Sequence, residues 1–384
     1  MKKILFLLIL FVLILLPVGL NAQTWSAIDR LTWNLGDSQF ASIAADSGTG
    51  IHVVWQDTTP NQPEIYYKRS TDSGSTWSSL ARLTWSSDPS TTPVIAADQN
   101  SSSLQVVWVD AFTRDIFFKR STDSGSTWSA LKRLTWNSDQ SKNPVVALDA
   151  GGNAHVIWAD NNPGNLEIFY KRSTNNYNNW GVITRLTWNN GLSDYPSLYI
   201  DASDVMHLVW EDLSPGNREI FYKRSTNHGT TWSAPMRLTW NSGHSYNACI
   251  AAHAGSELYL VWRDSTPGIA EIYFKSSTDS GITWSALKRL TWNSGDSRAP
   301  VVFSGSSGSI DVVWSDDTPG NNEIFHKRST DSGNTWYPIN RVTWNPNPAL
   351  NPSITKDSTG GLHIVWEDKP SGTAKFEILY KNYK

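Results

Sequence analysis

The stretch Lys68-Arg69-Ser70-Thr71-Asp72-Ser73-Gly74-Ser75-Thr76-Trp77 returns along the chain as Ser121–Trp128, Ser225–Trp232, Ser277–Trp284 and Ser329–Trp336. A second marker, Arg-Leu-Thr-Trp or Arg-Val-Thr-Trp, recurs in steps of 51 or 52 residues and begins at Arg30, Arg82, Arg133, Arg185, Arg237, Arg289 and Arg341. A period of this size signals a solenoid, a propeller or another repeat array. Seven copies fill residues 23–384, so the sequence predicts a repeat protein with no room for a second domain.

Each repeat has the pattern of four short strands joined by turn residues. In one complete unit the expected strands span residues 93–98, 104–110, 116–121 and 128–135, and no segment has a sustained helical period. Four such strands per repeat define one blade of a β-propeller. The predicted fold class is therefore all-β, a seven-bladed β-propeller of four-stranded blades over residues 23–384.

The two ends of the propeller sequence are complementary. Residues 24–32 have the pattern of a fourth strand without its first three, and residues 378–381 have that of a third strand without its fourth. We expect the N-terminal strand to complete the last blade, which closes the ring and removes exposed strand edges.

Residues 1–22 have the pattern of a secretory signal peptide. Lys2 and Lys3 precede an apolar run over residues 4–16, and the segment ends at Ala22. The run is shorter than the roughly 20 residues of a membrane-spanning helix, which favours cleavage over an uncleaved anchor. We therefore expect a secreted protein, extracellular or periplasmic, with no stable membrane insertion after cleavage.

Composition excludes several classes of partner and crosslink. The net charge of −3 gives no basic surface for nucleic acid. The single cysteine, Cys249, stands where other repeats carry Val94 or Val145, which favours a small core residue over a reactive thiol. One cysteine also cannot form an intramolecular disulfide.

All 21 tryptophans fall on three repeat positions, the Trp25/Trp77 type, the Trp33 type and the Trp55 type, with seven residues in each. Each tryptophan can bury about 150 to 250 Å² of surface. We expect most of them to pack between blades.

The motif Ser-x-Asp-x-Gly-x-Thr-Trp is intact around Asp72, Asp123, Asp279 and Asp331. Its Asp and Ser side chains can hydrogen-bond the backbone of a tight turn, and its Gly permits a positive φ. The motif resembles the Asp box of the bacterial neuraminidase repeat, found in sialidase-like propellers. The resemblance implies that these four aspartates are structural, on the face opposite the ligand site. Asp-box propellers include sialidases, other glycoside hydrolases, glycan-binding modules and assembly factors, so the fold does not choose among functions.

The resemblance to sialidases also implies three arginines, a tyrosine with a glutamate partner, and an aspartate acid/base. Among the segments that lead into the first strands, only Arg298 is an arginine. Near-identical blades do not differentiate the two carboxylates that a glycosidase needs. Asp37, Asp194 and Asp296 remain as loop carboxylates, for which a solvated position is the simpler interpretation. The sequence therefore predicts no catalytic residue.

Four histidines, His52, His155, His207 and His363, share one strand position on separate blades. This placement favours structural or solvated roles over a shared metal cluster. We expect no metal site and no cofactor.

The most regular feature of the face opposite the Asp boxes is a Trp-x-Asp row at the ends of the second strands. Its members are Trp55 and Asp57, Trp108 and Asp110, Trp158 and Asp160, Trp210 and Asp212, Trp262 and Asp264, Trp314 and Asp316, and Trp366 and Asp368. Each pair is followed by a carboxylate that opens the third strand, namely Glu64, Asp115, Glu167, Glu219, Glu271, Glu323 or Glu377.

Three interpretations of this row stay open. In the structural one, Asp57 caps a loop and Glu64 pairs with Arg82, which relieves the repulsion between facing carboxylates; we favour it. In the functional one, an indole face beside carboxylates forms a sugar site repeated up to seven times, with a gain from avidity. In the third, a cation lies between the carboxylates, although hard metals prefer about six oxygens.

Blade uniformity favours repeated binding over catalysis. The sequence thus predicts a secreted, lectin-like propeller that binds glycans or glycoconjugates multivalently, with the Trp-x-Asp row as the tentative ligand site. A sialidase-like glycoside hydrolase and a non-catalytic scaffold for other extracellular or envelope proteins are the alternatives.

Overall fold

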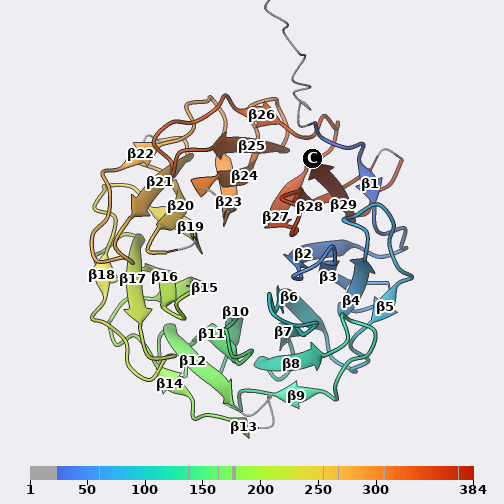
Figure 1. Ribbon diagram of the computed structural model, residues 1–384, viewed down its shortest axis with the longest axis horizontal. Coiled ribbons are helices and arrows are strands. Elements are labelled where there is room, and N and C mark those ends of the chain that lie inside the picture. The colour runs from blue at the N-terminus through green and yellow to red at the C-terminus, as the bar shows by residue number, and fades with distance from the viewer. Residues whose placement is uncertain are drawn as a thin grey trace, which may run out of the picture.

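The computed structural model has four strands in each of seven blades, and the blades are arranged in a ring (Figure 1). It describes residues 24–384 except 60, 137–138, 163, 175–178, 254, 267, 306–307 and 371. Within this described part there is no helix, and hence none long and apolar enough to cross a membrane. The predicted signal peptide lies outside the described residues. The seven-bladed, all-β prediction is confirmed.

The first and second strands form the inner half of each blade. The first strands are β2 (Ser38–Ala45), β6 (Ser90–Ala97), β10 (Ser141–Leu148), β15 (Ser193–Ile200), β19 (Ser245–Ala252), β23 (Ser297–Ser304) and β27 (Leu350–Lys356). The second strands are β3 (Ile51–Asp57), β7 (Leu104–Asp110), β11 (Ala154–Asp160), β16 (Met206–Asp212), β20 (Leu258–Asp264), β24 (Ile310–Asp316) and β28 (Leu362–Asp368). The first strands lie nearest the centre of the ring (Figure 1).

The third and fourth strands form the outer half. The third strands are β4 (Glu64–Ser70), β8 (Asp115–Ser121), β12 (Glu167–Thr174), β17 (Glu219–Ser225), β21 (Glu271–Ser277), β25 (Glu323–Ser329) and β29 (Glu377–Tyr383). The fourth strands are β5 (Ala81–Arg82), β9 (Lys132–Arg133), β14 (Thr184–Arg185), β18 (Met236–Arg237), β22 (Lys288–Arg289), β26 (Asn340–Arg341) and β1 (Asp29–Arg30), with β13 (Asn179–Trp180) as an extra strand beside β12. Blades are numbered one to seven from β2 to β29.

The fourth strands are much shorter than the sequence predicted. Residues 128–135 were expected to form one strand, but only Lys132–Arg133 pairs with β8. The backbone N–H of Arg120 bonds the Ser129 hydroxyl at 3.1 Å instead of a backbone carbonyl, so the ladder is interrupted near its start. The outer edge of each blade is therefore mostly extended loop.

Blade seven contains strands from both ends of the chain. β1 pairs antiparallel with β29, with Asp29 opposite Tyr380 and Arg30 opposite Leu379, and Trp25 forms a further bridge to Tyr383. The predicted closure by the N-terminal strand is confirmed. Leu31 is buried at this seam in a cluster that joins blade seven to blade one.

The core of the protein lies between blades. One cluster contains Ile65 and Tyr67 of blade one together with Val106 and Trp108 of blade two, and the other clusters have the same composition in other blade pairs. The second strands are buried along almost their whole length, because each has a strand on both edges and a neighbouring blade on each side. A blade therefore buries its apolar residues only when its neighbours are in place.

The turns that carry the Asp-box motif are held by their own side chains. Asp72 accepts the Thr76 backbone N–H at 2.8 Å and the Thr76 hydroxyl at 2.6 Å, while the Ser70 hydroxyl accepts the N–H of Gly74 at 2.9 Å. The Thr76 hydrogen bonds are the main cause that lowers the pKa of Asp72 to about 2. The same bonds recur at Asp123, Asp279 and Asp331.

At five junctions the third strand also places an aromatic side chain against the Asp-box turn of the next blade. The Tyr67 ring meets Trp128 edge to face, with centroids 5.1 Å apart. Gly125 has a φ of 80°, and a Cβ there would lie 1.9 Å from the Tyr67 hydroxyl oxygen, so only glycine fits. The other pairs of this kind are Tyr380 with Gly74, Tyr170 with Gly229, Tyr222 with Gly281 and Phe274 with Gly333.

The seam is expected to be as strongly packed as an ordinary junction. Leu31 and Leu83 occupy the same repeat position and are both buried, at 1% and 2% exposure. Leu31→Ala and Leu83→Ala should therefore each lower the free energy of unfolding by about 2 to 5 kcal/mol, measured by urea denaturation. A cost at Leu31 far below that at Leu83 would show that the N-terminal strand is only loosely attached.

Candidate functional site

The Trp-x-Asp row lies inside the blades. Its seven indoles are only 0–1% exposed, and the indole N–H of Trp210 donates to the Asp212 carboxylate at 2.9 Å. Equivalent bonds form at Trp55, Trp158, Trp262, Trp314 and Trp366. A buried indole has no free face on which a sugar could stack. The interpretation of Trp55, Trp108, Trp158, Trp210, Trp262, Trp314 and Trp366 as a ligand surface is thus corrected to one of core packing.

The aspartates of this row hold the loop that follows them. Asp57 accepts hydrogen bonds from the Ser38 hydroxyl at 2.7 Å and the Thr59 backbone N–H at 2.8 Å, and it is also bonded by Asn34. Its equivalents Asp110, Asp160, Asp212, Asp264, Asp316 and Asp368 are also buried. Burial is the main cause that raises the pKa of Asp368 to about 6.

The carboxylates that open the third strands are paired with the fourth strands. Arg82 contacts the buried Glu64 at 2.9 Å, and Glu64 also accepts the Thr84 hydroxyl. The same arginine pair recurs at Asp115, Glu167, Glu219, Glu271, Glu323 and, across the seam, Glu377. This geometry matches the structural interpretation of the row, in which the carboxylates are neutralised by arginine.

The exposed tryptophans are those of the Trp33 type. Trp33, Trp85, Trp136, Trp188, Trp240, Trp292 and Trp344 are 63–68% exposed. Each follows a fourth strand and lies where one blade meets the next, because Lys68 of blade one donates to the Leu31 carbonyl beside Trp33 at 2.8 Å. Seven large apolar side chains in one repeat position thus remain in solvent, which packing alone does not require.

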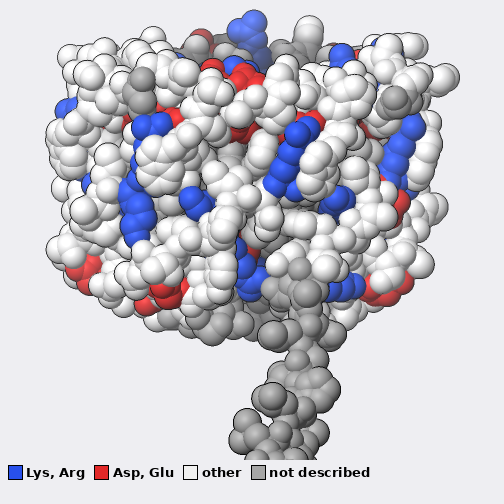
Figure 2. Space-filling view, turned by 90° about the horizontal axis from the view of Figure 1, so that it is seen from above, with Lys and Arg blue, Asp and Glu red and all other residues white. Residues whose placement is uncertain are grey.

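Two cations lie over six of these indoles, and Lys171 lies over the seventh, Trp136. The Arg30 guanidinium and the Lys68 ammonium lie 5.6 and 5.5 Å from the Trp33 ring centroid, within the range of a cation–π contact. Burial lowers the pKa of Lys68. The same pair of contacts occurs at Trp85, Trp188, Trp240, Trp292 and Trp344. Figure 2 shows Lys and Arg side chains along the outer wall of the ring.

A second, asymmetric group of side chains lies on the loop face, the face where the first strands begin. We call it the charged cluster, and it comprises Lys142, Asp194, Glu211, Arg218, Tyr246, Arg263, Asp296, Arg298 and Asp317 of blades three to six. It brings together the predicted loop carboxylates Asp194 and Asp296 with Arg298. Asp37 lies elsewhere, 3.3 Å from Lys375.

Three arginines and one tyrosine form a continuous path through the cluster. The guanidinium groups of Arg218 and Arg263 lie 5.8 and 5.3 Å from the Tyr246 ring centroid. Arg263 is 3.6 Å from Asp296, which Arg298 contacts at 2.9 Å. These side chains come from three consecutive blades, so the cluster spans the ends of neighbouring sheets.

Two facing carboxylates within the cluster differ in their surroundings. Asp194 and Glu211 are direct cross-strand partners on β15 and β16. Asp194 is bound by the Lys142 ammonium at 2.8 Å, and it is buried rather than solvated as expected. Burial raises the pKa of Glu211 to about 7, against the opposing effect of Arg218 at 2.8 Å. A carboxyl group with a pKa of about 7 thus faces a carboxylate that is paired with lysine.

The sequence search missed Arg218, Tyr246, Arg263 and Glu211. What marks such residues in the sequence is that they differ from the residues at the same position of other repeats. Arg263, for example, is the middle residue of Trp-x-Asp, where other blades have Gln56, Val109, Ala159, Ser315 or a glutamate. Arg218 and Arg263 lie at the beginning of a third strand and the end of a second, outside the segments that lead into the first strands.

The histidine row is buried and hydrogen-bonded. His52 contacts the Tyr67 hydroxyl through Nδ1 at 2.8 Å and Asp46 through Nε2 at 3.3 Å. His155, His207 and His363 have the same pair of partners in their own blades. Within the described ranges, no group of three or more His, Cys, Asp or Glu side chains could hold a metal ion.

No protein-family model matches the chain. A xyloglucanase of Hypocrea jecorina (strain QM6a) is 24% identical over 405 aligned residues, which cover 93% of this chain and 42% of that protein. The chain thus spans less than half the length of this curated relative.

Solved structures with the same architecture include carbohydrate-active proteins. The polysaccharide lyase Uly1 matches with a TM-score of 0.59 at 8% identity, over 88% of each chain. The intramolecular trans-sialidase from Ruminococcus gnavus, in complex with oseltamivir carboxylate, matches with a TM-score of 0.53 at 12% identity, over 92% of this chain and 97% of that one. At such identities the likeness shows a shared fold, that of sialidase-like β-propellers.

Replacing Glu211 by glutamine should change stability with a defined pH dependence. The folded-state pKa of about 7 is raised above the ordinary value of 4.5, so the stability contributed by the protonated carboxyl is full below the ordinary value and is lost as the pH rises through 7. Glutamine stays neutral at every pH. As the pH is raised from 5 to 8, the free energy of unfolding of Glu211→Gln should therefore rise relative to that of the parent, by up to roughly 3 kcal/mol. Urea unfolding at each pH measures this difference.

Glu367→Gln is the matched comparison, because burial also raises the pKa of Glu367 to about 7. Both variants should show the same direction of change. A stability difference that does not vary with pH would contradict the raised pKa of Glu211.

Proposed function

We propose that the protein is an exported, multivalent carbohydrate-binding propeller whose binding surfaces are centred on the seven exposed tryptophans of the Trp33 type. The observation that carries the proposal is that these indoles keep about two-thirds of their surface in solvent at every blade, while the other two tryptophan rows are partly or fully buried. An exposed indole offers a flat apolar face that suits the C–H face of a sugar ring. The N-terminal segment supports export.

The surroundings of each indole support a sugar over a purely apolar partner. Arg30 and Lys68 are held in place beside Trp33 by Glu377 and by the Leu31 carbonyl. Donors that are already fixed over an aromatic ring can bond sugar hydroxyls without ordering further side chains on binding. The carbohydrate-active relatives and structural neighbours add support of a general kind.

Seven equivalent platforms around one ring suit a polymer or a densely glycosylated surface. Linked weak sites gain about 10² to 10⁴ in overall avidity when several engage at once. A single soluble sugar should therefore bind weakly to this protein, and a polysaccharide much more tightly.

Replacing all seven Trp33-type residues by alanine should abolish binding. We expect the parent to bind selectively on a glycan array and to insoluble polysaccharides, and the sevenfold variant to lose roughly 100-fold or more of its apparent affinity. The variant should still fold, because the side chains removed are mostly solvent-exposed. Circular dichroism and thermal unfolding check this.

A variant with Leu35, Phe112 and Val182 changed to alanine is the control, since these are the most exposed apolar side chains outside the row, at 90, 74 and 86%. It should bind as the parent does. Full binding by the sevenfold tryptophan variant would refute the assignment of the site. A parent that binds no sugar would refute carbohydrate binding and favour a protein-binding scaffold.

A second candidate function, glycoside hydrolysis, is favoured by the charged cluster. Hydrolysis of a glycosidic bond needs one protonated and one ionised carboxyl in different environments. Glu211, with a pKa near 7, suits the acid, and Asp194 beside Lys142 suits the ionised partner. Arg218, Arg263 and Arg298 would then bind acceptor groups of the substrate.

Hydrolysis can be tested with a panel of 4-methylumbelliferyl glycosides, including sialosides, together with xyloglucan oligosaccharides. If the cluster is catalytic, Glu211→Gln should lower kcat by about 10² to 10⁴, and activity should fall above pH 7. Glu367→Gln, which removes a buried carboxyl outside the cluster, should keep activity. Equal losses in both variants would show that glutamine acts through stability rather than chemistry.

A further inference from the structure

The junction between blades six and seven differs from the others in one respect. At three junctions two donors of a third strand meet one carbonyl oxygen of the next blade's Asp-box turn. Tyr222 and Arg224 bond the Ser280 carbonyl at 3.3 and 2.9 Å. Tyr170 and Arg172 bond the carbonyl of His228, and Tyr67 and Arg69 that of Ser124. In each case the carbonyl belongs to the residue before the turn's glycine.

Blade seven has no such turn to offer. Its third and fourth strands, β29 and β1, come from opposite ends of the chain, so no Asp-box turn connects them within the described residues. Among the described residues, the closing Thr-Trp of the motif has a counterpart in Thr24 and Trp25. Trp25 meets His326 edge to face at 5.4 Å, as Trp128 meets Tyr67 at 5.1 Å.

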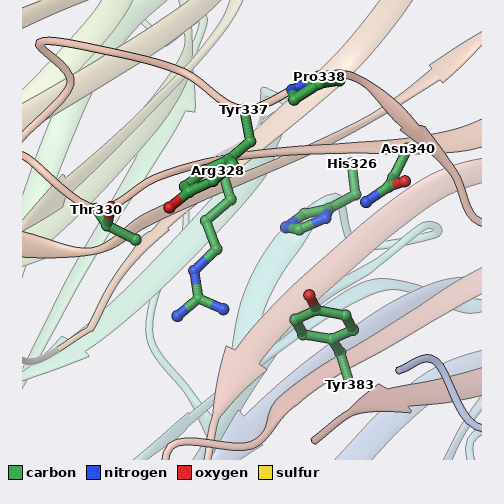
Figure 3. Close-up of a pocket in the computed structure, with 7 residues that line it drawn as sticks. All are labelled: His326, Arg328, Thr330, Tyr337, Pro338, Asn340 and Tyr383. Atoms are coloured by element: carbon green, nitrogen blue, oxygen red, sulfur yellow. The ribbon is translucent and has the colours of Figure 1, made fainter. Parts of the chain in front are cut away.

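A cavity of about 530 Å³ lies at this junction, lined by His326, Arg328, Thr330, Tyr337, Pro338, Asn340 and Tyr383. Figure 3 shows His326 and Arg328 on one side of the cavity, with the Tyr383 hydroxyl pointing toward the His326 ring from the other. A volume of this size is ordinary for a binding pocket. It lies where an Asp-box turn would lie at another junction.

The donors that hold the turn elsewhere are retained here. His326 stands at the Tyr67 position of its strand and Arg328 at the Arg69 position. His326 is 2% exposed and its Nε2 lies 2.8 Å from Asp311, while its Nδ1 has no hydrogen-bond partner among the described residues. Asp311 takes the N–H at Nε2, so Nδ1 can donate to an acceptor from outside only when the His326 ring is protonated on both nitrogens. A buried polar atom without a partner is costly, so the protonated ring would bind such an acceptor with a gain.

We propose that this cavity binds a glycine-containing peptide turn of a partner protein, in the place that the Asp-box turn holds at the other junctions. Nδ1 of the protonated His326 ring and the Arg328 guanidinium donate to one backbone carbonyl oxygen of the turn. The glycine follows that carbonyl, because at five junctions a Cβ at this position would lie within 2.5 Å of the third-strand aromatic ring. Tyr337 and Tyr383 border the bound turn.

The chain's own motif supplies the probe. A fluorescently labelled peptide of residues 71–75 (Thr-Asp-Ser-Gly-Ser) omits the strand residues 68–70, whose places residues 381–383 of β29 already fill. It also omits the closing Thr-Trp, whose places Thr24 and Trp25 fill. Fluorescence anisotropy with the purified protein should show saturable binding of one peptide per chain. The same peptide with its glycine changed to valine should not bind.

Two substitutions of His326 distinguish the effect of its hydrogen-bond donor from the effect of its ring shape. His326→Tyr restores the hydroxyl donor found at three other junctions and should keep the affinity. His326→Phe keeps the ring but removes the donor, and it should weaken binding about tenfold. Phenylalanine stands at this position in blade five as Phe274, so the variant is expected to fold. Arg328→Ser, which copies Ser276 of blade five, should weaken binding further.

The proposal is overturned if the parent does not bind the peptide, or if the Tyr and Phe variants bind it equally. Binding of the valine peptide with unchanged affinity would also overturn it, because the site would then lack the close approach that requires glycine. So would a sugar that occupies the cavity while the peptide does not. None of these outcomes depends on whether the exposed tryptophans bind carbohydrate.

Discussion

The contact between a third-strand aromatic ring and the Asp-box glycine of the next blade is the constraint on which the rest of the structure depends. A four-stranded blade is too thin to bury its own apolar residues, so Trp108 and Ile65 are shielded only when blades one and two pack together. The ring must therefore close, and β1 closes it by adding to β29. At the seam the chain ends supply the strand and the tryptophan, and within the described residues no Asp-box turn connects β29 to β1.

The fold could be predicted from the sequence because its signals are local and repeated. The spacing of Arg-Leu-Thr-Trp gives the number of blades, and the complementary partial repeats at the two ends give the closure. The solvent exposure of each tryptophan row could not be predicted from the local sequence pattern. The Trp55 and Trp33 rows each have one tryptophan per repeat, so the sequence does not distinguish them. Trp55 lies on a central strand with its indole N–H bonded to Asp57, whereas Trp33 lies beyond the end of an outer strand. Which of them contacts a neighbouring blade depends on the packing of sheets, so the sequence could not show that the Trp55 row is buried.

The charged cluster was missed for a different reason. Arg218, Tyr246 and Arg263 are far apart in the sequence and occupy three different positions of the repeat. They meet because the start of a first strand, the end of a second and the start of a third all lie on the loop face. Comparing repeats with one another would have found these residues as departures from the consensus, but their proximity follows only from the ring.

Uniform and divergent positions of the repeat support different kinds of function. Buried positions such as Leu83, Trp108 and Gly125 repeat because every junction has the same shape, so their repetition says nothing about ligands. The Trp33 row repeats without a packing requirement, which argues for an equivalent task at every blade. The cluster around Glu211 is the opposite case. Glu211 is a buried carboxyl at a repeat position where blades two and three have the apolar residues Val109 and Ala159. Burying a carboxyl whose pKa rises to about 7 costs stability at neutral pH. Glu367 stands at the same repeat position in blade seven and carries the same cost, so the cluster is set apart by the charged partners around Glu211 and Asp194, namely Arg218 and Lys142, rather than by the buried carboxyl alone.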